Sequence, residues 1–183
     1  MSINSLAQQV PDSLVAWLTS LLQSRLNSSL SLSLSPCRES WMLSLSGSAQ
    51  KINIKRHKVF YDSTPSSDIP CSAVPTLLPQ HDERIIKLKA PGLPSPSSQL
   101  WRQDEIGIHI SYDVLGLFYW TLSRKEEYSA DTSSYDQYGR FKFSSSHACK
   151  HDYIDVPLVD YWFIFLRYLL QILWPRIQTI KTN

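Results

Sequence analysis

The pattern of hydrophobic residues changes from a helical to a strand period early in the chain. Between residues 11 and 26 leucine recurs every three or four positions, which predicts an amphipathic helix with Asp12 or Ser13 as its N-cap. Later segments alternate hydrophobic with polar residues, and this period of two is typical of half-buried β-strands. The strands expected on this basis are 29–35, two within 40–54 that meet around Gly47, 59–62 as a continuation of the sheet, 84–89 and 105–111. The first of these, SLSLSLS, equally fits a low-complexity linker.

Two strongly apolar segments in the second half predict buried helices. Asp113 is the expected N-cap of a helix that continues to about Tyr128 and is hydrophobic all round in its first half, where Gly116 allows another group to approach closely. The last helix is expected at 157–175. The residues expected at its ends are Asp155 as N-cap, Pro157 as first helical residue and Pro175 as stop.

These elements together predict an α+β fold, in which a small antiparallel or mixed sheet from the first half is covered by two apolar helices from the second half. A chain of 183 residues fits a single domain. Its expected parts are a variable N-terminal helix and linker (1–35), a strand-rich part with Pro-rich loops at 63–80 and 90–99 (36–112), and a helical part (113–175) with a polar loop at 129–152.

Charge and cysteine content exclude several classes of protein. The net charge is only +2 and the most basic stretch, KINIKRHK at 51–58, alternates as a strand with solvated Lys and Arg would, so no nucleic-acid partner is expected. The last helix carries Asp160, Arg167 and Gln171 along one stripe, which argues against a membrane span. Three widely spaced cysteines and an N-terminus without the features of a secretory signal favour a cytoplasmic location.

Residues 122–140 concentrate opposite charges beside the most apolar segments, and these charges form the candidate site. We define the polar cluster as Arg124, Glu126, Glu127, Asp136, Arg140 and Asp160. One interpretation is an ion-pair network that fixes the 129–152 loop against the two helices, with Glu127 facing Arg124 and Ser123 on a helix. The other is a pocket in which the two arginines hold an anionic ligand and Glu127 or Asp160 serves as base or metal ligand.

The histidines give weaker signals. His147 and His151 are four residues apart, which on a helix would place both imidazoles on one face, with Cys149 and Asp152 nearby. The segment lies in a polar loop and no Glu follows the first histidine, which argues against a zinc site. His109 should point away from Ile108 and Ile110, towards solvent or the polar cluster. Nucleophile-elbow and phosphate-binding glycine motifs are absent, so the sequence indicates no metal and no cofactor.

Part of the second half resembles a known family. The segments SYDVLGLFYWTLSRKEEY, DQYGRF and DVPLVDYWFIFLRYLLQILWP, within about 105–175, are similar to an uncharacterised N-terminal domain found ahead of the catalytic domain in bacterial polysaccharide deacetylase-like proteins. The residues that match this pattern are Ser123, Arg124, Glu126, Glu127, Tyr128, Asp136, Gly139, Arg140, Phe141, Pro157 and Asp160. Members usually continue into a metal-dependent deacetylase domain. This sequence has no strand ending in the paired acidic motif of such enzymes, so the resemblance implies a link to surface-polysaccharide modification without that activity in this chain.

Two functions from different classes follow as hypotheses. The first is a non-catalytic accessory domain that contacts a deacetylase domain in cis or in trans through apolar surface near the last helix. Polysaccharide is a further possible partner, and Trp101 beside a Pro-rich loop is the aromatic residue expected to be exposed for it. The second is a stand-alone enzyme, a hydrolase or nuclease-like protein, that uses the polar cluster.

Overall fold

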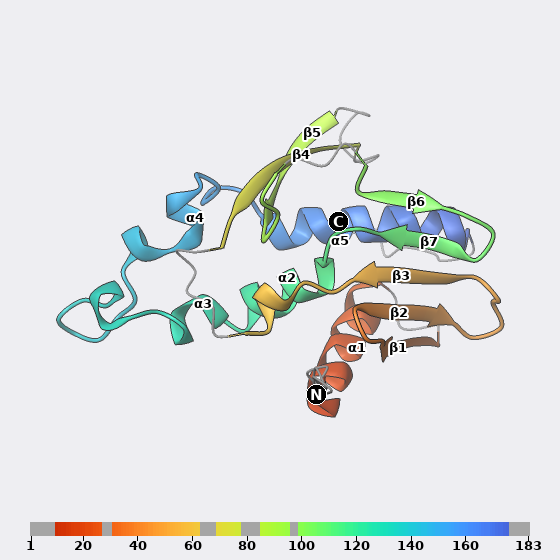
Figure 1. Cartoon of the computed structure of the whole chain (residues 1–183), viewed down its shortest axis with the longest axis horizontal. Coiled ribbons are helices and arrows are strands. Elements are labelled where there is room, and N and C mark those ends of the chain that lie inside the picture. The colour runs from red at the N-terminus through yellow and green to blue at the C-terminus, as the bar shows by residue number, and fades with distance from the viewer. Residues whose placement is uncertain (1–9, 27–30, 63–68, 78–84, 96–98, 176–183) are drawn as a thin grey trace, which may run out of the picture.

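A computed structural model describes residues 10–26, 31–62, 69–77, 85–95 and 99–175 (Figure 1). The helices are α1 (Asp12–Leu26), α2 (Val114–Leu122), α3 (Lys125–Tyr128), α4 (His147–Lys150) and α5 (Leu158–Leu173), with 3₁₀ turns η1 (Lys58–Phe60), η3 (Thr132–Ser134) and η4 (Phe143–Ser145). The strands are β1 (Leu32–Pro36), β2 (Ser40–Leu45), β3 (Lys51–Lys55), β4 (Cys71–Leu77), β5 (Ile85–Pro91), β6 (Trp101–Gln103) and β7 (Gly107–Ile110). Residues 1–9, and so the expectation for the N-terminus, lie outside the described residues.

Five strands form a mixed sheet in the order β1-β2-β3-β7-β6. Neighbouring strands are antiparallel except β3 and β7, which run parallel with Ile52 opposite Ile108. The strand pair within 40–54 turns at Gly47, whose φ of +80° favours glycine. The predicted α+β class with a mixed sheet is therefore confirmed, although β6 and β7 are contributed by the second half of the chain.

One face of this sheet makes the core and the other does not. Alternate residues such as Trp41, Leu43, Ile52 and Ile108 are fully buried, while the residues between them are exposed or half-buried. The alternation in the sequence therefore assigned the inner face of β2 and β3 correctly.

Helices cover the inner face of the sheet (Figure 1). α5 crosses behind β6 and β7, and α1 packs against β1. α2 packs on α5 through a stack of Phe118 on Phe163, whose ring centroids lie 3.9 Å apart. No helix in the described part of the chain has the length and apolar character needed to cross a membrane.

Strands β4 and β5 form a separate antiparallel hairpin, with Val74 opposite Leu88. The strand expected at 84–89 is thus confirmed as β5, but β4 corrects the expected loop across 63–80. Residues 71–77 contain Pro75, which obscures a strand signal because proline cannot donate to the ladder. The parts of that expected loop at 63–68 and 78–80 lie outside the described residues.

Three further expectations about element ends were wrong. Residues 58–60 form the 3₁₀ turn η1 and do not continue the sheet. The helix capped by Asp113 ends at Leu122, and α3 follows after Arg124. The last helix starts at Leu158 with Pro157, not Asp155, as its N-cap, because the chain first turns through 155–157 by backbone bonds.

Residues 123–152, which we call the arm, project from one end of the molecule (Figure 1). The arm replaces the expected polar loop with short elements: α3, η3, a bridge between Tyr135 and Phe141, η4 and α4. From residue 121 to residue 146 no side chain is buried. Local hydrogen bonds, not a core, therefore give the arm its shape.

Candidate functional site

A pocket of about 350 Å³ lies where the arm joins α2 and α5. Its apolar wall includes Trp120, Ala148 and Leu158. Its polar lining consists of Thr121, Arg124, Glu126, Glu127, Tyr153 and Asp160. The volume is within the usual range of small-ligand sites, at its lower end.

Four of the six residues of the polar cluster therefore line one pocket, and two do not. Asp136 and Arg140 pair with each other in the hairpin at 135–141, with 2.8 Å between Oδ2 and the guanidinium. The Arg140 guanidinium also lies 5.0 Å from the ring centre of Tyr138. This pair shapes the arm, and neither residue lines the pocket.

Arg124 and Glu127 form a bidentate ion pair at the mouth of the pocket. Arg124 Nε and Nη2 lie 2.6 and 2.5 Å from the two carboxylate oxygens of Glu127. Arg124 has a φ of +54°, which breaks the helix between α2 and α3 and is uncommon for a residue with a side chain. Ser123 does not face Glu127 as expected, because its hydroxyl donates to the Tyr119 carbonyl at 2.6 Å.

Glu126 ties α3 to α4 within the arm. Its carboxylate accepts a hydrogen bond from the backbone N–H of His147 at 2.9 Å. Burial raises the pKa of Glu126 above its ordinary value, and the neighbouring Glu127 adds to this effect, while the His147 amide opposes it. Glu126 is therefore the carboxyl group of the pocket with a raised pKa.

Asp160 lies on the opposite wall, in the first turn of α5. Its carboxylate is 3.4 Å from the Arg25 guanidinium of α1, and both side chains are more than half exposed. Pairs of this kind are screened by water and contribute little to stability. Asp160 thus links α5 to α1 and not to the arginines of the arm.

His147 is a buried structural residue. Its Nδ1 lies 2.6 Å from the Tyr153 hydroxyl and its Nε2 lies 3.0 Å from the Ile69 carbonyl. Because a carbonyl only accepts, Nε2 carries the proton and Nδ1 accepts from Tyr153. Burial lowers the pKa of His147 to about 4.

His151 does share a face with His147 as the spacing predicted, with ring centroids 4.2 Å apart. Both ring nitrogens of His147 are already bonded, however, and this leaves no lone pair for a metal. No group of three or more His, Cys, Asp or Glu residues in the described ranges has the geometry of a metal site. The three cysteines are free thiols.

Asp113 is a second buried polar residue, and the sequence predicted only its role as an N-cap. As expected it caps α2, accepting from the Gly116 amide at 2.7 Å. It also accepts from the His57 amide at 2.7 Å and from the Tyr61 hydroxyl at 3.2 Å. Burial raises the pKa of Asp113 to about 7 although these donors oppose the shift.

Gly116 allows this carboxylate to approach, because a Cβ at that position would lie 2.5 Å from Asp113 Oδ2. The close approach expected at Gly116 is thus made by the N-cap itself.

Trp101, the expected polysaccharide contact, is half-buried and lies opposite Ile110 on the inner side of the sheet. His109 points away from the isoleucines as expected, but its partner is Asp104 and not the polar cluster.

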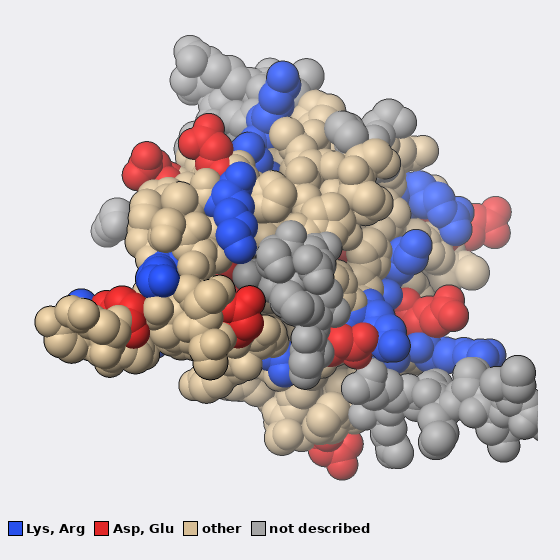
Figure 2. All heavy atoms as spheres, turned by 60° about the vertical axis from the view of Figure 1, so that its left-hand side comes forward, with Lys and Arg blue, Asp and Glu red and all other residues tan. Residues whose placement is uncertain are grey.

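Figure 2 views the molecule with the side of the arm turned forward. Basic and acidic side chains are interspersed there, without a large area of either sign. Around the pocket, Arg124 is paired with Glu127 and Asp160 with Arg25, while Glu126 bonds to a backbone amide.

The fold is a small α+β fold in which α1 and α5 cover one face of a mixed sheet. The chain belongs to DUF7033, a family of unknown function, whose model matches residues 17–175. No curated protein and no solved structure matches the chain.

Proposed function

We propose that this chain is a non-catalytic accessory domain that contacts polysaccharide deacetylase-like proteins acting in surface polysaccharide metabolism. The resemblance of residues 105–175 to the domain that precedes such enzymes supports this proposal. Membership of an uncharacterised domain family agrees with it at a coarser level.

The pairing of the charges of the polar cluster with one another is the observation that carries the proposal. Arg124 pairs with Glu127, and Asp136 pairs with Arg140, so both arginines that could hold a substrate are occupied by carboxylates three or four residues away. Glu126 holds the backbone of α4. These side chains stabilise the conformation of the arm. A projecting segment with a fixed conformation is suited to contact with a partner protein.

The arm also displays the aromatic residues that a partner would cover. Tyr128, Tyr138 and Phe143 are 84%, 73% and 65% exposed. Aromatic residues of this kind are enriched at the centres of protein interfaces, where they bring much contact area at low entropic cost. The accessory proposal therefore assigns the contact to the arm, next to the start of the last helix.

The test is a binding measurement between this chain and a polysaccharide deacetylase domain from the same genome, by isothermal titration calorimetry. The triple variant Y128S/Y138S/F143S should weaken binding at least about tenfold, as loss of central aromatic contacts does. The matched control is I106S, which removes an exposed apolar residue outside the arm. Absence of binding by the wild-type chain, or equal losses in both variants, would contradict the proposal.

The pocket supports a second candidate, a stand-alone hydrolase or nuclease-like enzyme. Glu126 has the raised pKa that a general acid or base needs, and it lies beside an apolar wall. Acyl, glycosyl and phosphodiester substrates should be assayed with the wild type and with E126Q. Turnover that disappears in E126Q while the fold is retained would replace the accessory proposal with this one.

A further inference from the structure

The outer face of the five-stranded sheet is a flat polar surface. Along each strand the residues between the buried ones point to this face, and none of them is buried. Their strand positions contain no Asp or Glu and no aromatic residue. They are Ser33 and Ser35 on β1, Ser40, Met42 and Ser44 on β2, Lys51, Asn53 and Lys55 on β3, His109 on β7 and Arg102 on β6.

The strand register arranges these residues in rows. The central row runs across all five strands, and its members are Ser35, Met42, Asn53, His109 and Arg102. Lys51 lies in the row on one side, opposite Ser44, and Lys55 lies in the row on the other side, opposite Ser40. With a rise of about 3.3 Å per residue, the two lysines stand about 13 Å apart along β3.

Lys51 and Lys55 differ from Arg124 and Arg140, which are both ion-paired with a carboxylate. Both lysines are exposed, and neither has an ion-pair partner among the described residues. Hydroxyl and amide groups surround them, with Ser33 Oγ 2.8 Å from Ser44 Oγ and Asn53 Nδ2 donating to Ser40 Oγ at 3.2 Å. The face therefore offers unneutralised positive charge beside many neutral hydrogen-bonding groups.

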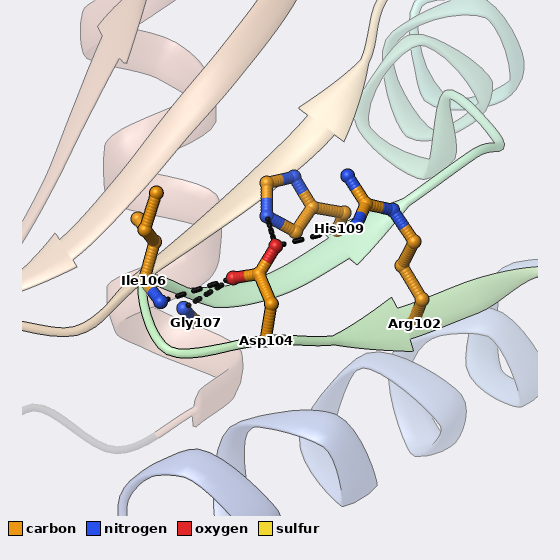
Figure 3. Close-up of polar contacts among 5 residues, drawn as sticks. All are labelled: Arg102, Asp104, Ile106, Gly107 and His109. Atoms are coloured by element: carbon orange, nitrogen blue, oxygen red, sulfur yellow. Dashed lines mark hydrogen bonds and ion pairs between the residues drawn. The ribbon is translucent and has the colours of Figure 1, made fainter.

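Asp104 fixes the position of Arg102, the third cation of this face, at the edge of the sheet (Figure 3). Its carboxylate accepts from the amides of Ile106 and Gly107 at 3.0 and 3.2 Å. Its second oxygen lies 3.3 Å from Arg102 and 2.9 Å from His109 Nε2.

Desolvation acts to raise the pKa of Asp104, but the two amides and the neighbouring cations lower it below its usual value. Asp104 thus stays ionised and positions the guanidinium and the imidazole on the outer face.

We propose that this face binds a linear anionic polysaccharide, with Lys51 and Lys55 paired to its acidic groups and the serine and asparagine side chains bonded to its hydroxyls. Charge complementarity and the spacing of the cations carry this inference. It goes beyond the proposed function, because it uses neither the arm nor a deacetylase.

Two other classes of macromolecule fit the face less well. A single-stranded nucleic acid is held largely by stacking on aromatic side chains, and the strand positions of this face contain no Phe, Tyr or Trp. A protein partner requires an apolar or aromatic centre, and Met42 is the one apolar side chain among these strand positions. A polymer of hydroxyls and spaced carboxylates matches a surface of hydroxyls and spaced ammonium groups.

The experiment measures binding of an oligogalacturonate to the full chain by calorimetry, at low and at high NaCl. The variant K51Q/K55Q should weaken binding about tenfold or more, since each lost contact involves a charged group. The charge-matched control is K125Q/K150Q, which removes two lysines from the arm and should change affinity less than about twofold. Affinity of the wild type should fall with salt.

Several outcomes would overturn the proposal. These are no binding by the wild type at low salt, equal losses in both double variants, or binding of a neutral cello-oligosaccharide with the same affinity. Binding of single-stranded DNA that is as tight and equally sensitive to K51Q/K55Q would assign the face to nucleic acid instead. Deacetylase binding measured on the same variants keeps this result separate from the accessory proposal, because neither lysine lies on the arm.

Discussion

Replacement of Asp113 by asparagine tests how the buried network under α2 controls stability. In the folded protein the pKa of Asp113 is about 7, against an ordinary value of 3.8. Each pKa unit corresponds to 1.36 kcal/mol, so the full difference is at most about 4 kcal/mol. The folded state holds this proton more tightly than the unfolded state does. The contribution of Asp113 is therefore fully present below pH 3.8 and is lost as the pH rises through 7.

The assay is urea unfolding of the wild type and of D113N, followed by tryptophan fluorescence at several pH values from 4 to 8. D113N cannot titrate at this position, and it also places an amide N–H where the carboxylate accepted a bond from His57. The stability of the wild type minus that of D113N should fall by up to about 4 kcal/mol across this range. The contribution of His147 has the opposite sign, since its pKa is lowered, but it is common to both proteins and cancels in the difference.

A difference that stays constant with pH, or that grows as the pH rises, would refute this account. It would mean that the three donors stabilise the ionised carboxylate more than burial penalises it. The variant Y61F provides a second measurement if D113N does not fold. It keeps the carboxylate but removes the hydroxyl that lowers its pKa, so the loss of stability should extend to a higher pH.

Two further changes test close packing and a buried hydrogen bond. G107A should lower the free energy of unfolding by more than about 3 kcal/mol, because the new Cβ would lie 1.9 Å from the Lys51 carbonyl oxygen. G139A should lower it by about 1–2 kcal/mol, because Gly139 has a φ of +73° but nothing lies within 4 Å of its Cβ position. Equal losses in denaturant unfolding would contradict this. Y153F should cost about 1–3 kcal/mol, because it leaves His147 Nδ1 buried without a donor, and a wild-type unfolding midpoint would show that this bond is not made.

Periodicity predicted the parts of the fold that depend on burial of one face. Leu18, Leu22 and Leu26 of α1 and the alternating residues of β2 and β3 are buried as their spacing indicates, because a half-buried element must repeat with its own period. β4 was missed because Pro75 lies within a Pro- and Ser-rich stretch of sequence, which resembles a loop. In the structure this strand is stabilised by pairing with β5, and such long-range pairing leaves little trace in local composition.

The candidate site was predicted in part for a similar reason. The sequence identified Arg124, Glu127 and Asp160 as neighbours of apolar segments, and the fold brings them to one pocket. It could not show that Arg124 adopts a positive φ, which ends α2 and sets the direction of the arm. Nor could it show that Asp113 meets η1, because that contact joins residues 56 positions apart.

The absence of buried side chains between residues 121 and 146 has a consequence for the integrity of the molecule. A protease that cut the chain within this stretch would expose no core, and the two fragments would still be held together by the stack of Phe118 on Phe163. The two fragments should therefore stay associated as complementing halves. The same stretch should also tolerate replacement or insertion of residues while the rest of the protein remains folded.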